Sequence, residues 1–153
     1  MPSGAKSAFA EIDLDRWGRV LATNTTGSFL TLREAVRRME NGSIVAMSSM
    51  AAPLGGAGEV VDYAASKGAV ESMVLGLARE VAAQGLRINA IRPGLIDTEM
   101  QAAIDPARLA RLAATVPMGR AGTAAEVAEA AVWLLSDAAS YVTGAILPVS
   151  GGR

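Results

Sequence analysis

The chain has 153 residues, of which 51% are hydrophobic and 4% aromatic, and its 14 basic and 15 acidic side chains give a net charge of −1. This composition predicts one globular domain with an aliphatic core, and the absence of a dense basic stripe argues against nucleic acid as a partner. Cysteine and histidine are absent, which excludes disulfides and thiolate metal sites, removes the usual general base near pH 7, and leads us to expect no bound metal.

The N-terminal segment MPSGAKSAFAEIDLD lacks the apolar centre of a secretory signal. No apolar run in the sequence reaches the roughly 20 residues that a membrane helix needs. We therefore expect a cytoplasmic protein with no membrane contact.

The first predicted element is a long helix that Asp13 caps. Apolar residues recur at mostly helical spacing over residues 14–39, with an interruption or relaxation near residues 24–27. The segment NGSIVAMSS, residues 41–49, then begins with a turn dipeptide and continues as an apolar run too short for a helix. We interpret this run as a buried strand.

The middle of the chain predicts a loop, a helix and a second strand. The glycine-rich segment PLGGAGE, residues 53–59, is expected to be the loop, and residues 62–84 the helix. Gly85 stands where a left-handed residue closes a helix. The segment LRINAIRP, residues 86–93, is expected to be a buried strand that its final proline stops.

The last third predicts a helix and a third strand. Residues 94–120 are expected to form a loop with one or two short helices. Thr123 and Glu126 have the spacing of a capping box that opens a helix running to about Ser136. The segment GAILPVSGG, residues 144–152, is expected to be the third strand.

This order of elements predicts a layered α/β fold with about three parallel strands and flanking helices. The helices between the strands are long enough to serve as crossovers. Three strands make a thin sheet, so we expect a neighbour to be missing at one edge. No repeat or linker divides the chain, and residues 1–153 are expected to form a single partial domain.

The pair Tyr63 and Lys67 is the first candidate for chemistry. Residues four apart lie on one helix face, so a phenol and an ammonium group are expected to project into the same region. The positive charge favours the phenolate, which makes the tyrosine a better acid or base near neutral pH. A tyrosine and a lysine also fall four residues apart by chance, one packed and one solvated. The pair alone does not decide between a catalytic pair and a chance spacing.

Two strand ends add to this pair. Ser48 and Ser49 follow the first strand, and RPGLIDT, residues 92–98, ends the second. The carboxyl ends of parallel strands are where α/β folds bind ligands. A polar strand end and a plain turn remain the alternatives for each segment taken singly.

With these segments in order, the chain resembles the short-chain dehydrogenase/reductase family, Rossmann-type oxidoreductases with a Tyr-x-x-x-Lys motif. The resemblance rests on five segments in order: TNTTGSFL, GSIVAMSS, YAASK, INAIRPGLIDTEM and YVTGAILPVSGG. It implies a truncated Rossmann-like fold and hydride transfer between NAD or NADP and a small-molecule carbonyl or alcohol.

The resemblance also implies roles for individual residues. Tyr63 would donate or accept the proton, Lys67 would favour the phenolate and bind the nicotinamide ribose, Ser49 would hold the substrate oxygen, and Asn24 would anchor a water relay behind Lys67. Ser48 is the fallback for Ser49. The nicotinamide and its carboxamide would be lined by Pro93, Gly94, Ile96 and Thr98.

The family's first half has no counterpart in this sequence. There is no glycine-rich turn after a first strand and no residue to bind the adenosine ribose. We therefore expect the chain alone to bind NAD or NADP poorly.

Two other functions remain open at this point. Ser49 could be the nucleophile of a cofactor-independent hydrolase acting on an ester, activated by Tyr63 and Lys67. The chain could also be a non-catalytic fragment.

A homo-oligomer is expected. The strand SIVAMSS, residues 43–49, would have one unpaired edge, and such an edge invites pairing. The interface would use this edge or the two long helices, which commonly form the dimer interface of the resembled family.

Overall fold

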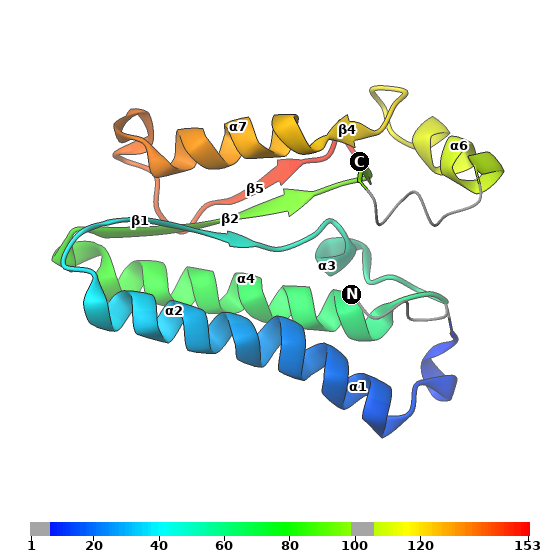
Figure 1. Cartoon of the computed structure of the whole chain (residues 1–153), viewed down its shortest axis with the longest axis horizontal. Helices are drawn as coiled ribbons and strands as arrows, with labels where there is room; N and C mark the ends of the chain where they lie inside the picture. Colours follow the sequence, from blue (N-terminus) through cyan, green and yellow to red (C-terminus); the bar gives the residue numbers. More distant parts are fainter. Residues whose placement is uncertain (1–6, 99–105) are drawn as a thin grey trace.

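The computed structural model describes residues 7–98 and 106–153, and its centre is a parallel three-stranded sheet in the order β1-β2-β5 (Figure 1). The strands are β1 (Gly42–Met47), β2 (Leu86–Pro93) and β5 (Ile146–Val149). Helices α2 (Gly27–Arg38) and α4 (Val61–Val81) cover one face of the sheet, and α7 (Ala124–Leu135) covers the other. Helix α1 (Leu14–Leu21) packs against α4. The predicted layered α/β fold with three parallel strands is confirmed.

The long N-terminal helix consists of three helical segments. They are α1 (Leu14–Leu21), a π-helical turn (Ala22–Thr26) and α2 (Gly27–Arg38), after a 3-10 turn (Phe9–Glu11). Asp13 caps α1, because its carboxylate accepts a 2.7 Å hydrogen bond from the Arg16 backbone N–H. The predicted interruption near residues 24–27 is this π-helical turn.

The segment between β1 and β2 differs slightly from its prediction. A short helix, α3 (Ala51–Leu54), takes the first two residues of the expected loop over 53–59. The main helix α4 (Val61–Val81) is followed by a 3-10 turn (Ala82–Gln84), so the helix predicted over 62–84 tightens in its last three residues. Gly85 has φ = 81° and closes it, as predicted.

The C-terminal third contains a strand pair that the sequence did not predict. β3 (Ile96–Asp97) lies parallel to β4 (Gly122–Thr123) within and just beyond the segment expected to be a loop. Two residues are too few for a period-two pattern, which is why the prediction was wrong there. The helices of this part are α6 (Pro106–Ala114), α7 (Ala124–Leu135) and a 3-10 turn (Asp137–Ala139).

The core lies on both faces of the central strand β2. Ile88 and Ala90 pack toward α4 and α2, whereas Ile91 packs toward α7, and all three are fully buried. The alternation follows from the two-residue period of a strand. β2 is therefore the central strand, which contacts the helices on both faces and pairs with β1 and β5.

One edge of β1 is unpaired in the described part of the chain, since β1 bonds only to β2 there. Among residues 7–98 and 106–153, no helix is both long enough and apolar enough to span a membrane.

Candidate functional site

The site begins where β1 ends against the first turns of α4. The Nζ of Lys67 donates a 2.9 Å hydrogen bond to the backbone carbonyl of Met47, the last residue of β1. The next peptide N–H, that of Ser48, bonds to the Ile91 carbonyl of β2 at 2.8 Å. Because the N–H and C=O of one peptide point in opposite directions, the Met47 carbonyl faces away from β2. The ammonium group thus lies at the carboxyl end and free edge of β1.

Tyr63 lies one helical turn before Lys67, as its spacing predicted. The Lys67 Nζ lies 5.7 Å from the centre of the Tyr63 ring, within the range of a cation–π contact. Within the described residues, the Tyr63 hydroxyl makes no hydrogen bond. The structure therefore brings the phenol and the ammonium together and leaves the phenol oxygen available.

The ammonium group of Lys67 is half-buried and has no carboxylate partner among residues 7–98 and 106–153. Burial lowers the pKa of Lys67 below its ordinary value, because desolvation disfavours the charged form. An ammonium group carries three N–H donors, and the Met47 carbonyl takes one. Two donors are left for a ligand oxygen.

The two serines after β1 have different environments. Ser48 is buried, and its hydroxyl donates a 2.6 Å hydrogen bond to the Glu71 carboxylate. The Ser49 Oγ accepts a 3.1 Å hydrogen bond from the Ala51 backbone N–H, which leaves its own proton free to donate. This contrast favours Ser49 over the fallback Ser48 as a group that could meet a substrate oxygen.

Asn24 joins the N-terminal helices to α4 from behind Tyr63. Its Nδ2 donates a 3.1 Å hydrogen bond to the buried Ser66 hydroxyl, which in turn donates at 2.7 Å to the Tyr63 backbone carbonyl. The Asn24 backbone carbonyl accepts a 2.6 Å bond from Ser28. Asn24 is therefore connected to the Tyr63 backbone through Ser66, and the expected water relay stays a prediction.

The residues expected to line a nicotinamide begin with Pro93, the last residue of β2, and continue beyond the strand. Pro93 accepts a 3.0 Å bond from the Met50 backbone N–H, which ties this segment to the residues beside Ser49. Gly94 packs against β5 so closely that a Cβ there would lie 2.8 Å from the Ser150 Cα. Ile96 lies in β3, and Thr98 is exposed. Close strand packing alone explains the glycine at position 94.

A carboxylate that the sequence analysis missed lies beside these groups. Glu71, on α4, accepts bonds from Ser48 and from Arg92, whose Nε and Nη2 each donate at 2.6 Å. Burial raises the pKa of Glu71, but the bonds from Arg92 and Ser48 outweigh it and hold the pKa below its ordinary value. The spacing of Glu71 four residues after Lys67 was the only available signal.

A second carboxylate holds the start of α4. Asp62 is buried and accepts bonds from the Arg16 guanidinium at 2.7 and 3.1 Å. Burial raises the pKa of Asp62. The bonds from Arg16 and from the Tyr63 backbone N–H lower it by more, so that the pKa lies below its ordinary value. Within the described residues, no group of three or more acidic side chains is placed to hold a metal ion.

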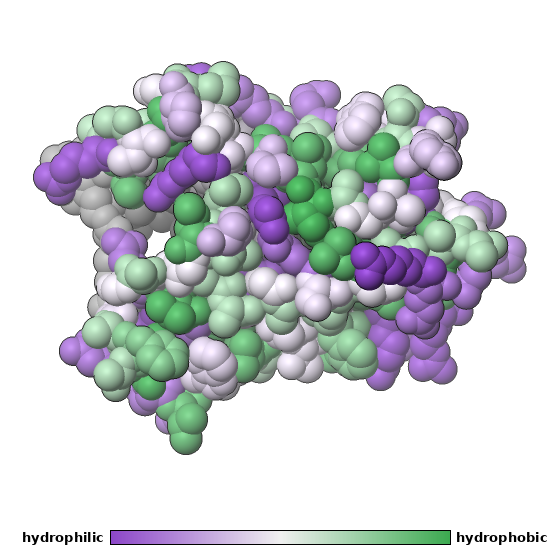
Figure 2. Space-filling view, turned by 180° about the vertical axis from the view of Figure 1, so that it is seen from behind, coloured by the Kyte–Doolittle hydropathy of each residue, from purple (hydrophilic) through white to green (hydrophobic). Residues whose placement is uncertain are grey.

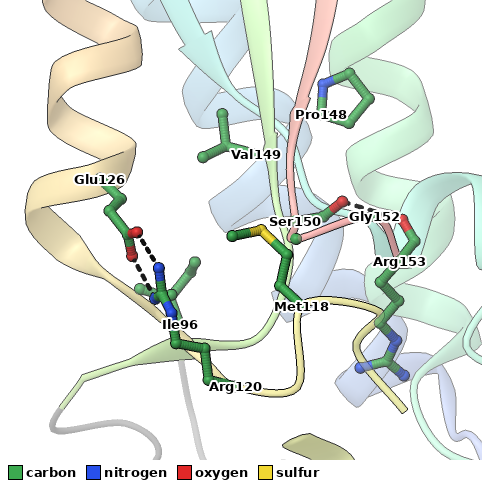
Figure 3. A pocket seen from close by; sticks show the side chains of 11 residues that line it. Ile96, Met118, Arg120, Glu126, Pro148, Val149, Ser150, Gly152 and Arg153 are labelled. Atoms are coloured by element: carbon green, nitrogen blue, oxygen red, sulfur yellow. Dashed lines mark hydrogen bonds and ion pairs between the residues drawn. The ribbon is translucent and has the colours of Figure 1, made fainter.

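A cavity of about 560 Å³ lies beyond the end of β5 (Figure 3). Met118, Val149 and Ile96 give it an apolar lining, and a two-bond ion pair between Arg120 and Glu126 stands at its side. The bonds from Arg120 and from the Thr123 backbone lower the pKa of Glu126 to about 2. Of the predicted site residues, only Ile96 lines this cavity.

Comparison with known proteins identifies the family. A family model described as Enoyl-(Acyl carrier protein) reductase matches residues 1–153. The chain therefore belongs to the short-chain dehydrogenase/reductase family, as its motifs and layered fold indicated.

Three curated relatives show how far the similarity extends. The uncharacterized oxidoreductase YgfF of Escherichia coli is 54% identical over 91% of this chain and 59% of its own length. The 3-oxoacyl-[acyl-carrier-protein] reductase FabG of Chlamydia pneumoniae is 38% identical over 90% and 56%. A protein described as inactive 2-(S)-hydroxypropyl-CoM dehydrogenase 2, from Xanthobacter autotrophicus, is 40% identical over 92% and 64%. The chain thus spans a little over half the length of the relatives that it matches.

Proposed function

We propose that this chain carries the Ser/Tyr/Lys site of an NAD(P)-dependent oxidoreductase that interconverts a small-molecule carbonyl and its alcohol. The observation that supports it most is the pairing of Lys67 with Tyr63, with the ammonium at the end of β1 and 5.7 Å from the ring. A phenol oxygen without an internal partner among the described residues is free to meet a substrate oxygen.

In reduction, Tyr63 would give its hydroxyl proton to the carbonyl oxygen while Ser49 donates a hydrogen bond to that same oxygen. The positive charge of Lys67 would stabilise the phenolate that remains. In oxidation the same atoms would act in reverse, with the phenolate accepting the alcohol proton. Asn24 would hold the backbone at Tyr63 through Ser66.

The residues present fit the nicotinamide end of the cofactor. Two N–H donors of Lys67 remain for ribose hydroxyls. Pro93 ends β2, and Gly94, Ile96 and Thr98 follow it. When bound, the cofactor supplies or accepts the hydride. The sequence offers no glycine-rich cradle for the pyrophosphate, so we expect binding by this chain alone to be weak.

The first substrates to test are 3-oxoacyl thioesters, because relatives at 38% identity are described as 3-oxoacyl-[acyl-carrier-protein] reductases. We expect the purified chain to oxidise NADPH or NADH slowly in their presence, measured at 340 nm, with cofactor binding measured by calorimetry.

Tyr63→Phe is expected to remove this turnover and to leave the fold unchanged. Tyr141→Phe is the matched control, because Tyr141 is the chain's other tyrosine and is fully exposed. Equal turnover of the two variants would contradict the proposal.

A second candidate is the cofactor-independent ester hydrolase. It is favoured by two observations: the Ser49 proton is free, and burial lowers the pKa of Lys67, so that a larger fraction of its amine is neutral and able to accept a proton. Turnover of a p-nitrophenyl ester without cofactor, lost in Ser49→Ala, would support it.

The third possibility, a non-catalytic chain, keeps its place because one relative at 40% identity is described as inactive. It predicts that Tyr63→Phe changes neither ligand binding nor activity.

A further inference from the structure

Glu71 connects three segments of the rim through one buried carboxylate. Its side chain lies on α4, one turn beyond Lys67, and the residue is 8% exposed. Ser48 bonds to it from the end of β1, and Arg92 bonds to it from the end of β2. A buried carboxylate costs free energy unless charged or polar donors satisfy it, and three donors do so here.

The connected segments are those that carry the proposed chemistry. Ser48 lies between the Met47 carbonyl, which holds the Lys67 ammonium, and the candidate Ser49. Arg92 directly precedes Pro93. Beyond the end of β1, backbone bonds from Ser48 to Ile91 and from Met50 to Pro93 continue the pairing of the two strands.

We propose that Glu71 is a positioning residue, which holds α4 against the ends of β1 and β2 and thereby fixes Lys67 and Ser49 relative to Tyr63. This role rests on the proposed function, because it matters only if those three groups act together. Glu71 itself touches neither the Tyr63 hydroxyl nor the Lys67 ammonium in any bond of the described structure.

Stability alone does not explain a buried ion pair at this position. Well-packed apolar residues of similar volume commonly stabilise a protein as well as a buried ion pair does, or better. An apolar pair makes no directional hydrogen bonds, and so it cannot bind the Ser48 hydroxyl. The double variant Glu71→Met/Arg92→Met therefore separates the two roles, because it keeps the packing and removes the connection.

The test follows the chemical accessibility of Lys67. The chain has two lysines, Lys6 and Lys67, so labelling by an N-hydroxysuccinimide ester, read by peptide mass spectrometry, gives one rate for the site and one internal reference. In Glu71→Gln and in Glu71→Met/Arg92→Met we expect the ratio of Lys67 to Lys6 labelling to rise about tenfold, the order expected when one hydrogen bond to a charged group is lost.

Arg87→Gln is the matched control. Arg87 lies at the opposite end of β2 and donates to the backbone carbonyls of Leu134, Val142 and Ser136. Its loss should lower thermal stability without changing the labelling ratio. Equal labelling in all variants, or the same rise in Arg87→Gln, would overturn the positioning role.

The outcomes also separate this inference from the proposed function. If the parent chain shows no turnover while the labelling ratio responds as expected, the oxidoreductase proposal fails and the mechanical role of Glu71 stands. If turnover is found, kcat should fall in the double variant with KM little changed, because Glu71 contacts no substrate in this proposal. Unchanged kcat would contradict the positioning role.

Discussion

We expect the burial of the Lys67 ammonium to cost more folding free energy than its hydrogen bond to Met47 returns. A half-buried ammonium with a single backbone acceptor is poorly solvated, and burial lowers its pKa accordingly. A charge kept at such a place, beside a phenol, is typical of a site that uses it.

Replacement of Lys67 by methionine tests this directly. We expect Lys67→Met to keep its free energy of unfolding, or to raise it by up to about 1 kcal/mol, because a desolvated charge is removed. Turnover should fall by about 100-fold or more. Urea unfolding and the 340 nm assay measure the two effects.

Arg87→Met is the comparison for this substitution. Arg87 satisfies several backbone carbonyls, so its loss should cost about 1–3 kcal/mol of stability. A loss of the same size in Lys67→Met would show that the ammonium is structural.

Among the elements, α4 is anchored by two carboxylates of lowered pKa, one just before Tyr63 and the other one turn after Lys67. Asp62 pairs with Arg16 of α1, and Glu71 pairs with Arg92 of β2. For a carboxyl whose folded pKa lies below its unfolded value, the stabilisation is complete above the ordinary pKa, 3.8 for Asp62 and 4.5 for Glu71. It is lost as pH falls through the lowered folded value.

We therefore expect the free energy of unfolding to decrease steeply as the pH is lowered from about 5 to about 2. Asp62→Asn should reduce the stability near neutral pH and flatten this part of the profile. Urea unfolding across the pH range measures both. A variant with the same acid slope as the parent would show that Asp62 is not one of the groups responsible.

Two glycines near α4 make a second prediction at this scale. Gly85 has φ = 81°, a conformation that costs an alanine about 1–2 kcal/mol. Gly76 lies inside α4 with no atom within 4 Å of an added Cβ, so alanine there should gain about 0.5–1 kcal/mol. Thermal unfolding of Gly85→Ala and Gly76→Ala should give opposite signs, and equal signs would contradict the cap assignment.

The elements that the sequence predicted are those with local signals. Asp13, Gly85 and the Thr123–Glu126 capping box mark helix ends through residues at most three apart. The Glu71–Arg92 pair joins residues 21 positions apart on different elements, and β3 and β4 pair across 26 positions. No spacing rule within one element reveals such contacts, and so the connection at the rim appeared only in three dimensions.

For the whole molecule, the free edge of β1 and the exposed apolar side chains favour self-association. Figure 2 shows apolar groups gathered along the middle of one face. Exposed apolar residues include Phe29 and Leu30 on α2 and Leu75 on α4. These belong to the two long helices that the sequence analysis named as an alternative interface.

We propose that the chain forms a homodimer or a higher oligomer at micromolar concentration. Light scattering should then give at least twice the 15.6 kDa of one chain. Phe29→Glu should shift the mass toward the monomer if the helices form the interface, and should leave it unchanged if the β1 edge does. A monomer for the parent chain would contradict the proposal.

The outward-facing Met47 carbonyl has a consequence for solubility. A strand that pairs with the free edge of β1 would bond to the backbone carbonyls along that edge. The last of these carbonyls, that of Met47, already accepts a hydrogen bond from the Lys67 ammonium. Lysine side chains at the edges of β-sheets commonly oppose edge-to-edge pairing between molecules. We therefore expect Lys67 to hinder the addition of a strand at this end of β1, so that an interface through this edge would use the part of the strand before Met47.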